Sequence, residues 1–153
     1  MKRLLLILAL GAAAYFGLVP ESGTAQYHAK ADAPEVSQRI PENGDAVIES
    51  AFASRTGNLQ VAGQGTVVKL LKDDTNGSRH QRFIVRLKSG RTLLVSHNID
   101  LAPRIDSLAT GDTIAFYGEY EWSSKGGVIH WTHHDPQGRH PAGWIKHGDQ
   151  TYQ

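Results

Sequence analysis

The stretch that decides the fold of this chain reads Gln81-Arg82-Phe83-Ile84-Val85-Arg86-Leu87, then Lys88-Ser89-Gly90-Arg91, then Thr92-Leu93-Leu94-Val95-Ser96-His97. In its first part, apolar residues at every second position alternate with Arg82 and Arg86. A period of two is typical of a half-buried β-strand. Because a Ser-Gly turn separates two such runs, the stretch predicts an antiparallel β-hairpin.

Further β-rich segments flank this hairpin. Residues 66–71 predict a strand before it, residues 113–122 a fourth strand and residues 128–133 a fifth. Residues 103–108 form a connection with at most one helical turn. A short helix is expected near residues 45–52, capped by Asp45, ended by Gly57 and apolar at Val47, Ile48, Ala51 and Phe52. The order predicts a mainly β fold, a small five-stranded OB-like β-barrel with a short N-terminal helix. A five- or six-stranded sandwich is the alternative.

The N-terminal residues have the pattern of a secretory leader. A basic start at Lys2 and Arg3 precedes an apolar run, and small residues surround Ala25. Residues 4–19 fall short of the roughly 20 that span a bilayer. We therefore expect residues 1–25 to be a cleaved signal peptide, residues 26–43 a flexible tether and residues 44–153 the barrel. The expected location is the periplasm, with no stable membrane span after cleavage, and an uncleaved N-terminal anchor is the alternative.

Composition excludes several classes of function. The chain has 153 residues and no Cys, which excludes disulfides, thiolate nucleophiles, Cys-based zinc sites and a lipid-anchored Cys. Removal of residues 1–25 leaves equal numbers of basic and acidic residues. A neutral domain has no overall electrostatic attraction to nucleic acid. Basic residues nevertheless gather in one window, namely Lys69, Lys72, Arg79, Arg82, Arg86, Lys88 and Arg91.

This basic window predicts a ligand-binding face on the second strand. Its expected members are cationic or aromatic and are Arg79, His80, Arg82, Arg86, His97 and Trp131, with Tyr117 and Trp144 as further stacking surfaces. Such a face fits single-stranded nucleic acid or an anionic glycan. The alternative is a solvated strand face with its aromatic residues in the core.

A histidine cluster within residues 126–136 predicts a second kind of site. A zinc peptidase motif requires Glu directly after the first His, and Trp131 stands there instead. A non-helical site for zinc or another divalent metal remains, formed by His130 and His134 with His97 or Asp135, and it would make the protein a metal-dependent hydrolase. If residues 128–133 are one strand, Trp131 and His133 face away from His130. Otherwise these histidines only build the barrel rim, as in a structural or partner-binding envelope protein.

Two smaller groups of polar residues each have a structural and a functional interpretation. Asn98 and Asp100 favour an Asx turn, which does not require the neighbouring His97. Glu119 and Glu121 share a strand face and form either a carboxylate pair for acid–base chemistry or a soluble edge strand. No paired nucleophile and base is identifiable, so catalytic residues are unknown and the enzyme question stays open.

Taken together, these motifs resemble an exported bacterial family known as a domain of unknown function (number 3465). The resemblance rests on residues 65–67, 71–74, 79–84, 97–103, 118–122 and 126–136 and extends over residues 45–152. It implies an OB-like barrel behind a signal peptide and a loose association with nucleic-acid-binding lipoproteins. This chain departs from that association because it has no lipidation Cys. The resemblance implies no established activity.

Overall fold

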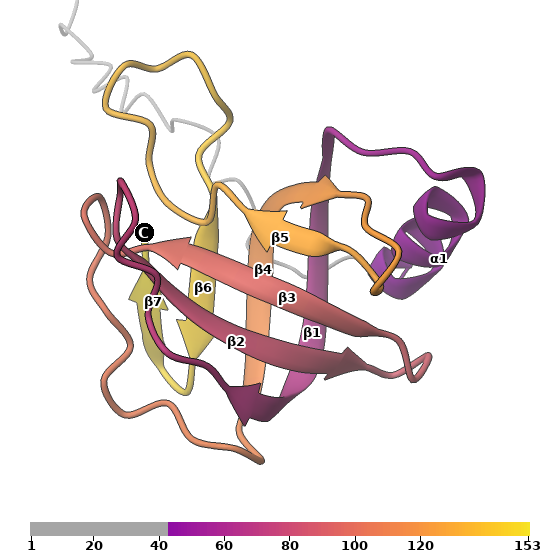
Figure 1. Ribbon diagram of the computed structural model, residues 1–153, viewed down its shortest axis with the longest axis horizontal. Helices are drawn as coiled ribbons and strands as arrows, with labels where there is room; N and C mark the ends of the chain where they lie inside the picture. The colour runs from indigo at the N-terminus through magenta and orange to yellow at the C-terminus, as the bar shows by residue number, and fades with distance from the viewer. Residues whose placement is uncertain (1–42) are drawn as a thin grey trace, which may run out of the picture. The chain divides into compact units, whose positions relative to one another are not determined.

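The computed structural model describes residues 43–153, so the predicted leader and all but the last residue of the tether lie outside the described residues. Figure 1 shows one helix beside strongly curved strands. The elements are α1 (Gly44–Ser54), β1 (Leu59–Leu70), β2 (His80–Leu87), β3 (Thr92–Asn98), β4 (Thr113–Glu121), β5 (Val128–His130), β6 (Trp144–His147) and β7 (Gln150–Tyr152).

The sheet closes on itself. Its strand order is β1-β2-β3-β5-β4-β6-β7, and an additional pairing joins β1 to β4. β3 and β5 are parallel, whereas the neighbouring pairs are antiparallel. This closure confirms the predicted five-stranded OB-like barrel. It also excludes the sandwich, whose two sheets would keep separate edges.

β1 closes the barrel because it pairs with two strands in succession. Residues 59–66 pair with β4, and residues 65–70 pair with β2 through a bulge between Val67 and Lys69. Two glycines lie where β1 changes partner. A Cβ on Gly63 would lie 2.6 Å from the Phe116 ring, and one on Gly65 would lie 2.9 Å from the carbonyl oxygen of Arg86. The Phe116 ring at Gly63 and the β2 backbone at Gly65 therefore leave no room for a Cβ.

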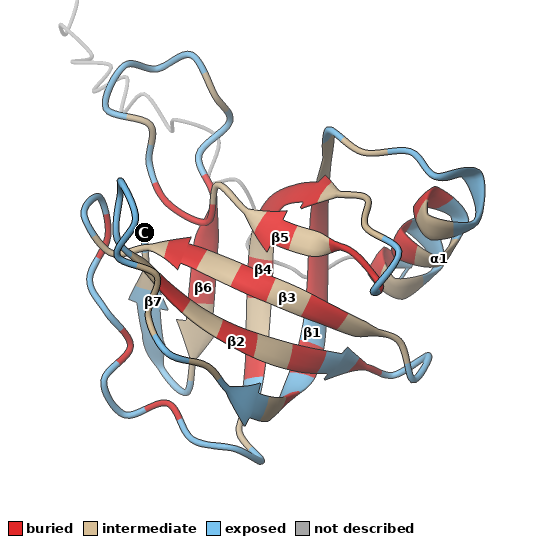
Figure 2. Cartoon of the chain, in the orientation of Figure 1, coloured by how far each residue is buried: buried red, intermediate tan, exposed pale blue. Residues whose placement is uncertain are grey.

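The core follows the alternation seen in the sequence. Along β2 and β3, buried and partly exposed residues alternate, as Figure 2 shows. The largest fully buried side chains include Tyr120, Phe83 and Phe116. Each contributes about 1.5–3 kcal/mol through burial. The alternation expected for the second strand is confirmed.

The ends of α1 differ from the prediction. The N-cap position is held by Asn43 and not by Asp45, and no side chain caps the helix. The Asp45 carboxylate instead accepts a hydrogen bond from the backbone N–H of Ser89 at 3.1 Å. The helix ends at Arg55 in the left-handed conformation, before Gly57. Ile48 and Ala51 are buried as predicted, whereas Val47 is 41% exposed.

The connections also differ in detail. The segment between β3 and β4 holds no helical turn, and the buried side chain of Gln81 ties it to the barrel. The Gln81 amide donates to the carbonyl of Ile105 and accepts from its N–H, both at 2.9 Å. The C-terminal tail adds β6 and β7 to the sheet. It buries Trp144, one of the expected stacking residues, together with Ile145.

Candidate functional site

The outer faces of β4 and β5 bring a carboxylate and an imidazole together. Glu119 lies directly opposite His130 in the antiparallel register. Glu119 Oε1 lies 3.1 Å from His130 Nε2, and the Glu119 side chain is only 11% exposed. β4 is not an edge strand, because it pairs with β1 on one side and with β5 and β6 on the other. The solubility interpretation of Glu119 is therefore wrong, and a carboxylate this withdrawn from water requires cationic or polar partners.

The loop after β5 folds over Glu119 and supplies a second imidazole. His140 Nε2 lies 2.6 Å from Glu119 Oε2. The indole of Trp131 stacks on the His140 ring, with centroids 4.2 Å apart and planes inclined by 5°. The Asp135 carboxylate holds the loop by accepting hydrogen bonds from the backbone N–H groups of Gln137, Arg139 and His140. The site thus depends on a loop with fixed internal bonding.

A break in the strand allows this arrangement. The fifth strand was expected to extend to residue 133, but β5 ends at His130. The backbone of Trp131 takes a φ of 51°, a region that bulky residues rarely occupy. The chain leaves the sheet there, so Trp131 does not alternate with His130 across a strand as expected. It turns toward His140 instead.

A second carboxylate completes the group. One ligand atom each of Glu119, Glu121 and His130 lie within 4.8 Å of one another. We call Glu119, Glu121, His130 and His140 the Glu–His cluster. Burial lowers the pKa of His130, against the opposing effect of the nearby Glu119 and Glu121 carboxylates. His130 Nε2 is buried and makes no well-directed hydrogen bond, although Glu119 Oε1 lies at ion-pair distance.

The structure does not bring the metal ligands expected from the sequence together. Of His97, His130, His134 and Asp135, only His130 belongs to the Glu–His cluster. The side chain of His134 is exposed. Both oxygens of Asp135 accept backbone hydrogen bonds within its own loop. These bonds explain why an aspartate follows the histidines, and no metal ion is needed for that.

His97 has a structural environment. The residue is fully buried, and its Nε2 lies 3.1 Å from the carbonyl oxygen of Pro103. Since a carbonyl only accepts, Nε2 carries the proton, and Nδ1 accepts from the Thr132 hydroxyl at 2.8 Å. Burial lowers the pKa of His97 to about 4. Neither ring nitrogen is left for a metal or a ligand.

The predicted ligand-binding face is divided by internal contacts. Arg79 pairs with Asp100 at 2.7 Å. The Arg82 guanidinium lies 3.6 Å from Asp74 and also donates to the carbonyl of Lys72.

The Asp100 N–H donates to Asn98 Oδ1 at 2.9 Å, which confirms the Asx turn.

The remaining members of that face are also separated. His80 Nδ1 lies 2.8 Å from the carbonyl oxygen of Ser78. The Trp131 ring is occupied by His140 and lies 5.3 Å from the His133 ring. Arg86 alone among the predicted face residues is exposed and makes no ion pair within residues 43–153.

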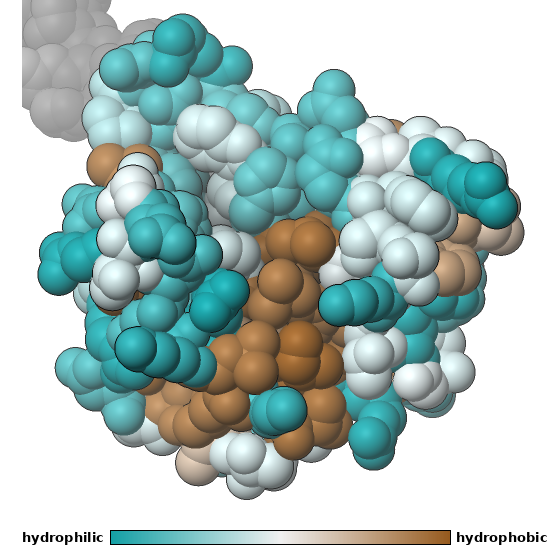
Figure 3. Space-filling view, viewed as in Figure 1, coloured by the Kyte–Doolittle hydropathy of each residue, from teal (hydrophilic) through white to brown (hydrophobic). Residues whose placement is uncertain are grey.

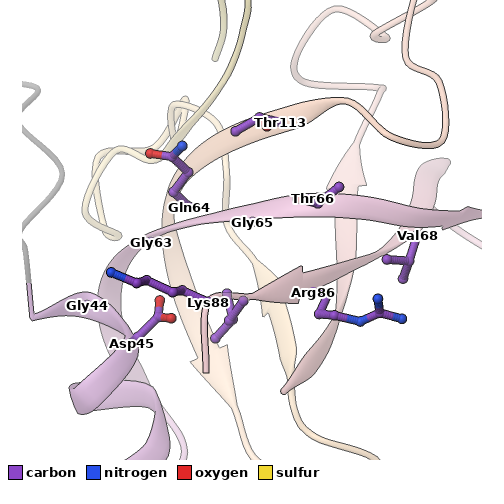
Figure 4. A pocket seen from close by; sticks show the side chains of 11 residues that line it. Gly44, Asp45, Gly63, Gln64, Gly65, Thr66, Val68, Arg86, Lys88 and Thr113 are labelled. Atoms are coloured by element: carbon purple, nitrogen blue, oxygen red, sulfur yellow. The ribbon is translucent and has the colours of Figure 1, made fainter. Parts of the chain in front are cut away.

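Arg86 lines a groove of about 610 Å³ between β1, the end of β2 and the start of α1. We call it the β1–β2 groove. Figure 4 shows Arg86, Lys88 and Gln64 around it, with Asp45 at one side. Its other polar side chains are Thr66 and Thr113. Lys88, like Arg86, is exposed and forms no ion pair within the described part of the chain.

An apolar row crosses the outer face of the sheet next to this groove. Ile84 pairs with Leu94 and Leu94 with Val128, and all three are partly exposed. Figure 3 shows the hydrophobic region that occupies the middle of this view, with polar residues around it. The row is part of the β2–β3 surface on which OB-type barrels carry ligands.

Sequence reasoning missed His140 entirely and placed neither Glu121 nor Lys88 in a site. Glu121 was considered with Glu119 as a carboxylate pair or as part of a soluble edge strand, and Lys88 was noted only as a member of the basic window. The register of β4 against β5, if known, would have placed Glu119 opposite His130. No sequence signal indicates that His140 returns to Glu119, because that contact depends on the path of the loop.

Comparison with known proteins gives a family and no activity. A family model described as a protein of unknown function (DUF3465) matches residues 36–153. No curated protein matches the chain. Among the described residues, no helix has both the length and the apolar character needed to cross a membrane.

Proposed function

The chain belongs to this family of unknown function, and from that premise we propose that its barrel is a binding module for an anionic glycan. The observation that carries the proposal is the β1–β2 groove. Arg86 and Lys88 are two cations that line it and make no ion pair within residues 43–153. Unpaired cations beside a concave surface attract anionic ligands and raise their rate of association.

The other groove residues suit a ligand rich in hydroxyl groups. Gln64, Thr66 and Thr113 offer hydrogen-bond donors and acceptors. Gly63 and Gly65 form part of the lining and bring the ligand close to the backbone of β1. The start of α1 also lines the groove through Gly44 and Asp45, and the Asp45 carboxylate already accepts a hydrogen bond from the backbone N–H of Ser89.

The composition of the groove favours a glycan over a single-stranded nucleic acid. Proteins that bind single strands stack bases on aromatic side chains. Among residues 43–153, no aromatic residue lines the β1–β2 groove, and Trp131, the expected stacking residue, already stacks on His140. The expected leader, residues 1–25, would carry the barrel to the compartment where cell-envelope glycans are found.

Direct titration tests the proposal. The tag-free barrel is titrated at low ionic strength with polygalacturonate, heparin, a neutral dextran and single-stranded DNA. Binding of the acidic glycans that weakens with salt is expected. Arg86→Ala and Lys88→Ala should each lower affinity about tenfold, since a hydrogen bond to a charged group contributes about 1.5–3 kcal/mol.

Lys125→Ala is the matched control, because Lys125 is exposed in the turn between β4 and β5 and lies outside the groove. It should bind like the parent protein. Equal affinity of the Arg86/Lys88 double variant and the parent would contradict the proposal. Preference for single-stranded DNA over every glycan would replace the ligand class.

A further inference from the structure

We propose that the Glu–His cluster is a binding site for one Zn²⁺ ion, with Glu119, Glu121 and His130 as ligands and His140 as the hydrogen-bond partner that orients Glu119. The cluster shares no residue with the β1–β2 groove. The proposal is therefore independent of the proposed glycan binding, and either can fail alone.

His140 fixes the orientation of the Glu119 carboxylate. Its Nε2 lies 2.6 Å from Glu119 Oε2, which is the distance of a short hydrogen bond from an imidazole N–H to a carboxylate. Two atoms bound to one Zn²⁺ ion at 2.0–2.2 Å lie farther apart than this. His140 therefore holds Oε2 and leaves Oε1 beside His130.

One ring nitrogen of His130 lacks a hydrogen-bond partner. His130 Nε2 is buried, has no directed hydrogen bond and lies 3.1 Å from Glu119 Oε1. Ligand atoms bound at 2.0–2.2 Å in a tetrahedral site lie about 3.4 Å apart. The His130–Glu119 pair already has nearly this spacing. A cation beside Glu119 would satisfy the orphaned nitrogen.

The surrounding structure holds the ligands in place. His140 is fixed by stacking on Trp131, and a hydrogen-bonded partner of this kind orients a metal-binding carboxylate. β4 and β5 fix Glu119 and His130 by their register. Glu121 completes the set, since its carboxylate oxygen lies within 4.8 Å of the ligand atoms of Glu119 and His130.

The ligand types select the metal. Imidazole nitrogens with carboxylate oxygens suit Zn²⁺ and its neighbours among the transition metals, whereas Mg²⁺ and Ca²⁺ prefer oxygen ligands alone. The set differs from the one expected from the sequence. It keeps His130, replaces His134 and Asp135 by Glu119 and Glu121, and leaves His97 in the core.

The experiment is a Zn²⁺ titration of the tag-free protein after treatment with a chelator, followed by calorimetry. One Zn²⁺ per chain and a higher unfolding temperature with the metal are expected. Co²⁺ in place of Zn²⁺ should give the visible absorption of a tetrahedral site. Mg²⁺ and Ca²⁺ should not compete. Binding of Ca²⁺ without Zn²⁺ would overturn the proposal.

Variants separate this site from nonspecific binding by histidine. His130→Ala should weaken Zn²⁺ binding by more than the 10–100-fold that the loss of an outer partner costs, whereas His140→Ala removes such a partner and should weaken binding by about 10–100-fold. Glu119→Gln should have an effect as large as His130→Ala, and it retains the size of the side chain. His134→Ala is the matched control, because this exposed histidine lies in the same segment.

Circular dichroism checks that each variant is folded. Unchanged Zn²⁺ affinity in folded Glu119→Gln and His140→Ala would refute the site. Loss of binding in His134→Ala alone would restore the set expected from the sequence. No stoichiometric Zn²⁺ binding to the parent would show that Glu119 is paired with protonated histidines only.

Discussion

Acid should destabilise this barrel through His97. The His97 ring is fully buried, and burial lowers its pKa to about 4. An unfolded histidine has a pKa near 6.5. Between these values the unfolded chain binds a proton that the folded chain rejects. Stability from this residue is complete above about pH 6.5 and is lost as the pH falls toward 4, with no further loss below.

The difference of about 2.5 pKa units corresponds to about 3 kcal/mol of unfolding free energy, of which about 2 kcal/mol is lost between pH 7 and pH 5. With a typical urea dependence, a loss of 2 kcal/mol lowers the unfolding midpoint by about 1 M. Urea unfolding at pH 7, 6 and 5, with a chelator present, measures this shift. Nuclear magnetic resonance should show no titration of the His97 ring above pH 5.

The matched variant is His97→Gln, whose amide can donate to the carbonyl of Pro103 but does not titrate. It should be less stable than the parent at pH 7 and should lose about 2 kcal/mol less between pH 7 and pH 5. The lowered pKa of His130 acts in both proteins and cancels in the comparison. An equal loss in the two proteins would refute the assignment to His97.

Three stability predictions follow from other contacts. Gln81→Leu should cost about 2–4 kcal/mol in urea unfolding, because it leaves the buried N–H and carbonyl of Ile105 without partners; a change below 1 kcal/mol would contradict this role. Gly127→Ala should lower the melting temperature by several degrees, since φ is 117° there and the new Cβ would lie 2.2 Å from the Tyr120 ring. Phe83→Ala should cost about 3–5 kcal/mol through the cavity left by a fully buried ring, and chemical unfolding that shows no shift would contradict its place in the core.

The fold was predictable from local alternation. Phe83, Val85 and Leu87 alternate with polar or partly exposed neighbours in the sequence, and the structure buries them. A period of two is imposed by the backbone itself, so it is readable without knowledge of the partners. The turn at Asn98 was predictable for the same reason, because an Asx turn uses only neighbouring atoms.

The helix cap and the tail strands were harder to predict from the sequence. Asp45 has the side chain of a capping residue, yet its carboxylate bonds to Ser89, which lies 44 positions away. β6 is too short to have a readable period, and Trp144 pairs with Tyr117 on β4. Both features depend on contacts between segments that are distant in the sequence. Local preferences are weak where such contacts compete with them.

The Glu–His cluster depends on a violation of the pattern that identifies the strands. If β5 had continued through residue 133, Trp131 would have pointed to the face opposite His130. The positive φ of Trp131 costs about 1–2 kcal/mol for a residue other than glycine. That cost is offset where the loop is fixed elsewhere, by the three backbone hydrogen bonds to Asp135 and by the stacking on His140. Strain retained at such a cost commonly marks a functional position. Trp131, the residue at which the strand pattern fails, stacks on the His140 ring that contacts Glu119. The histidine segment and the Glu119–Glu121 pair could therefore each be recognised from the sequence, whereas the contact between them could not.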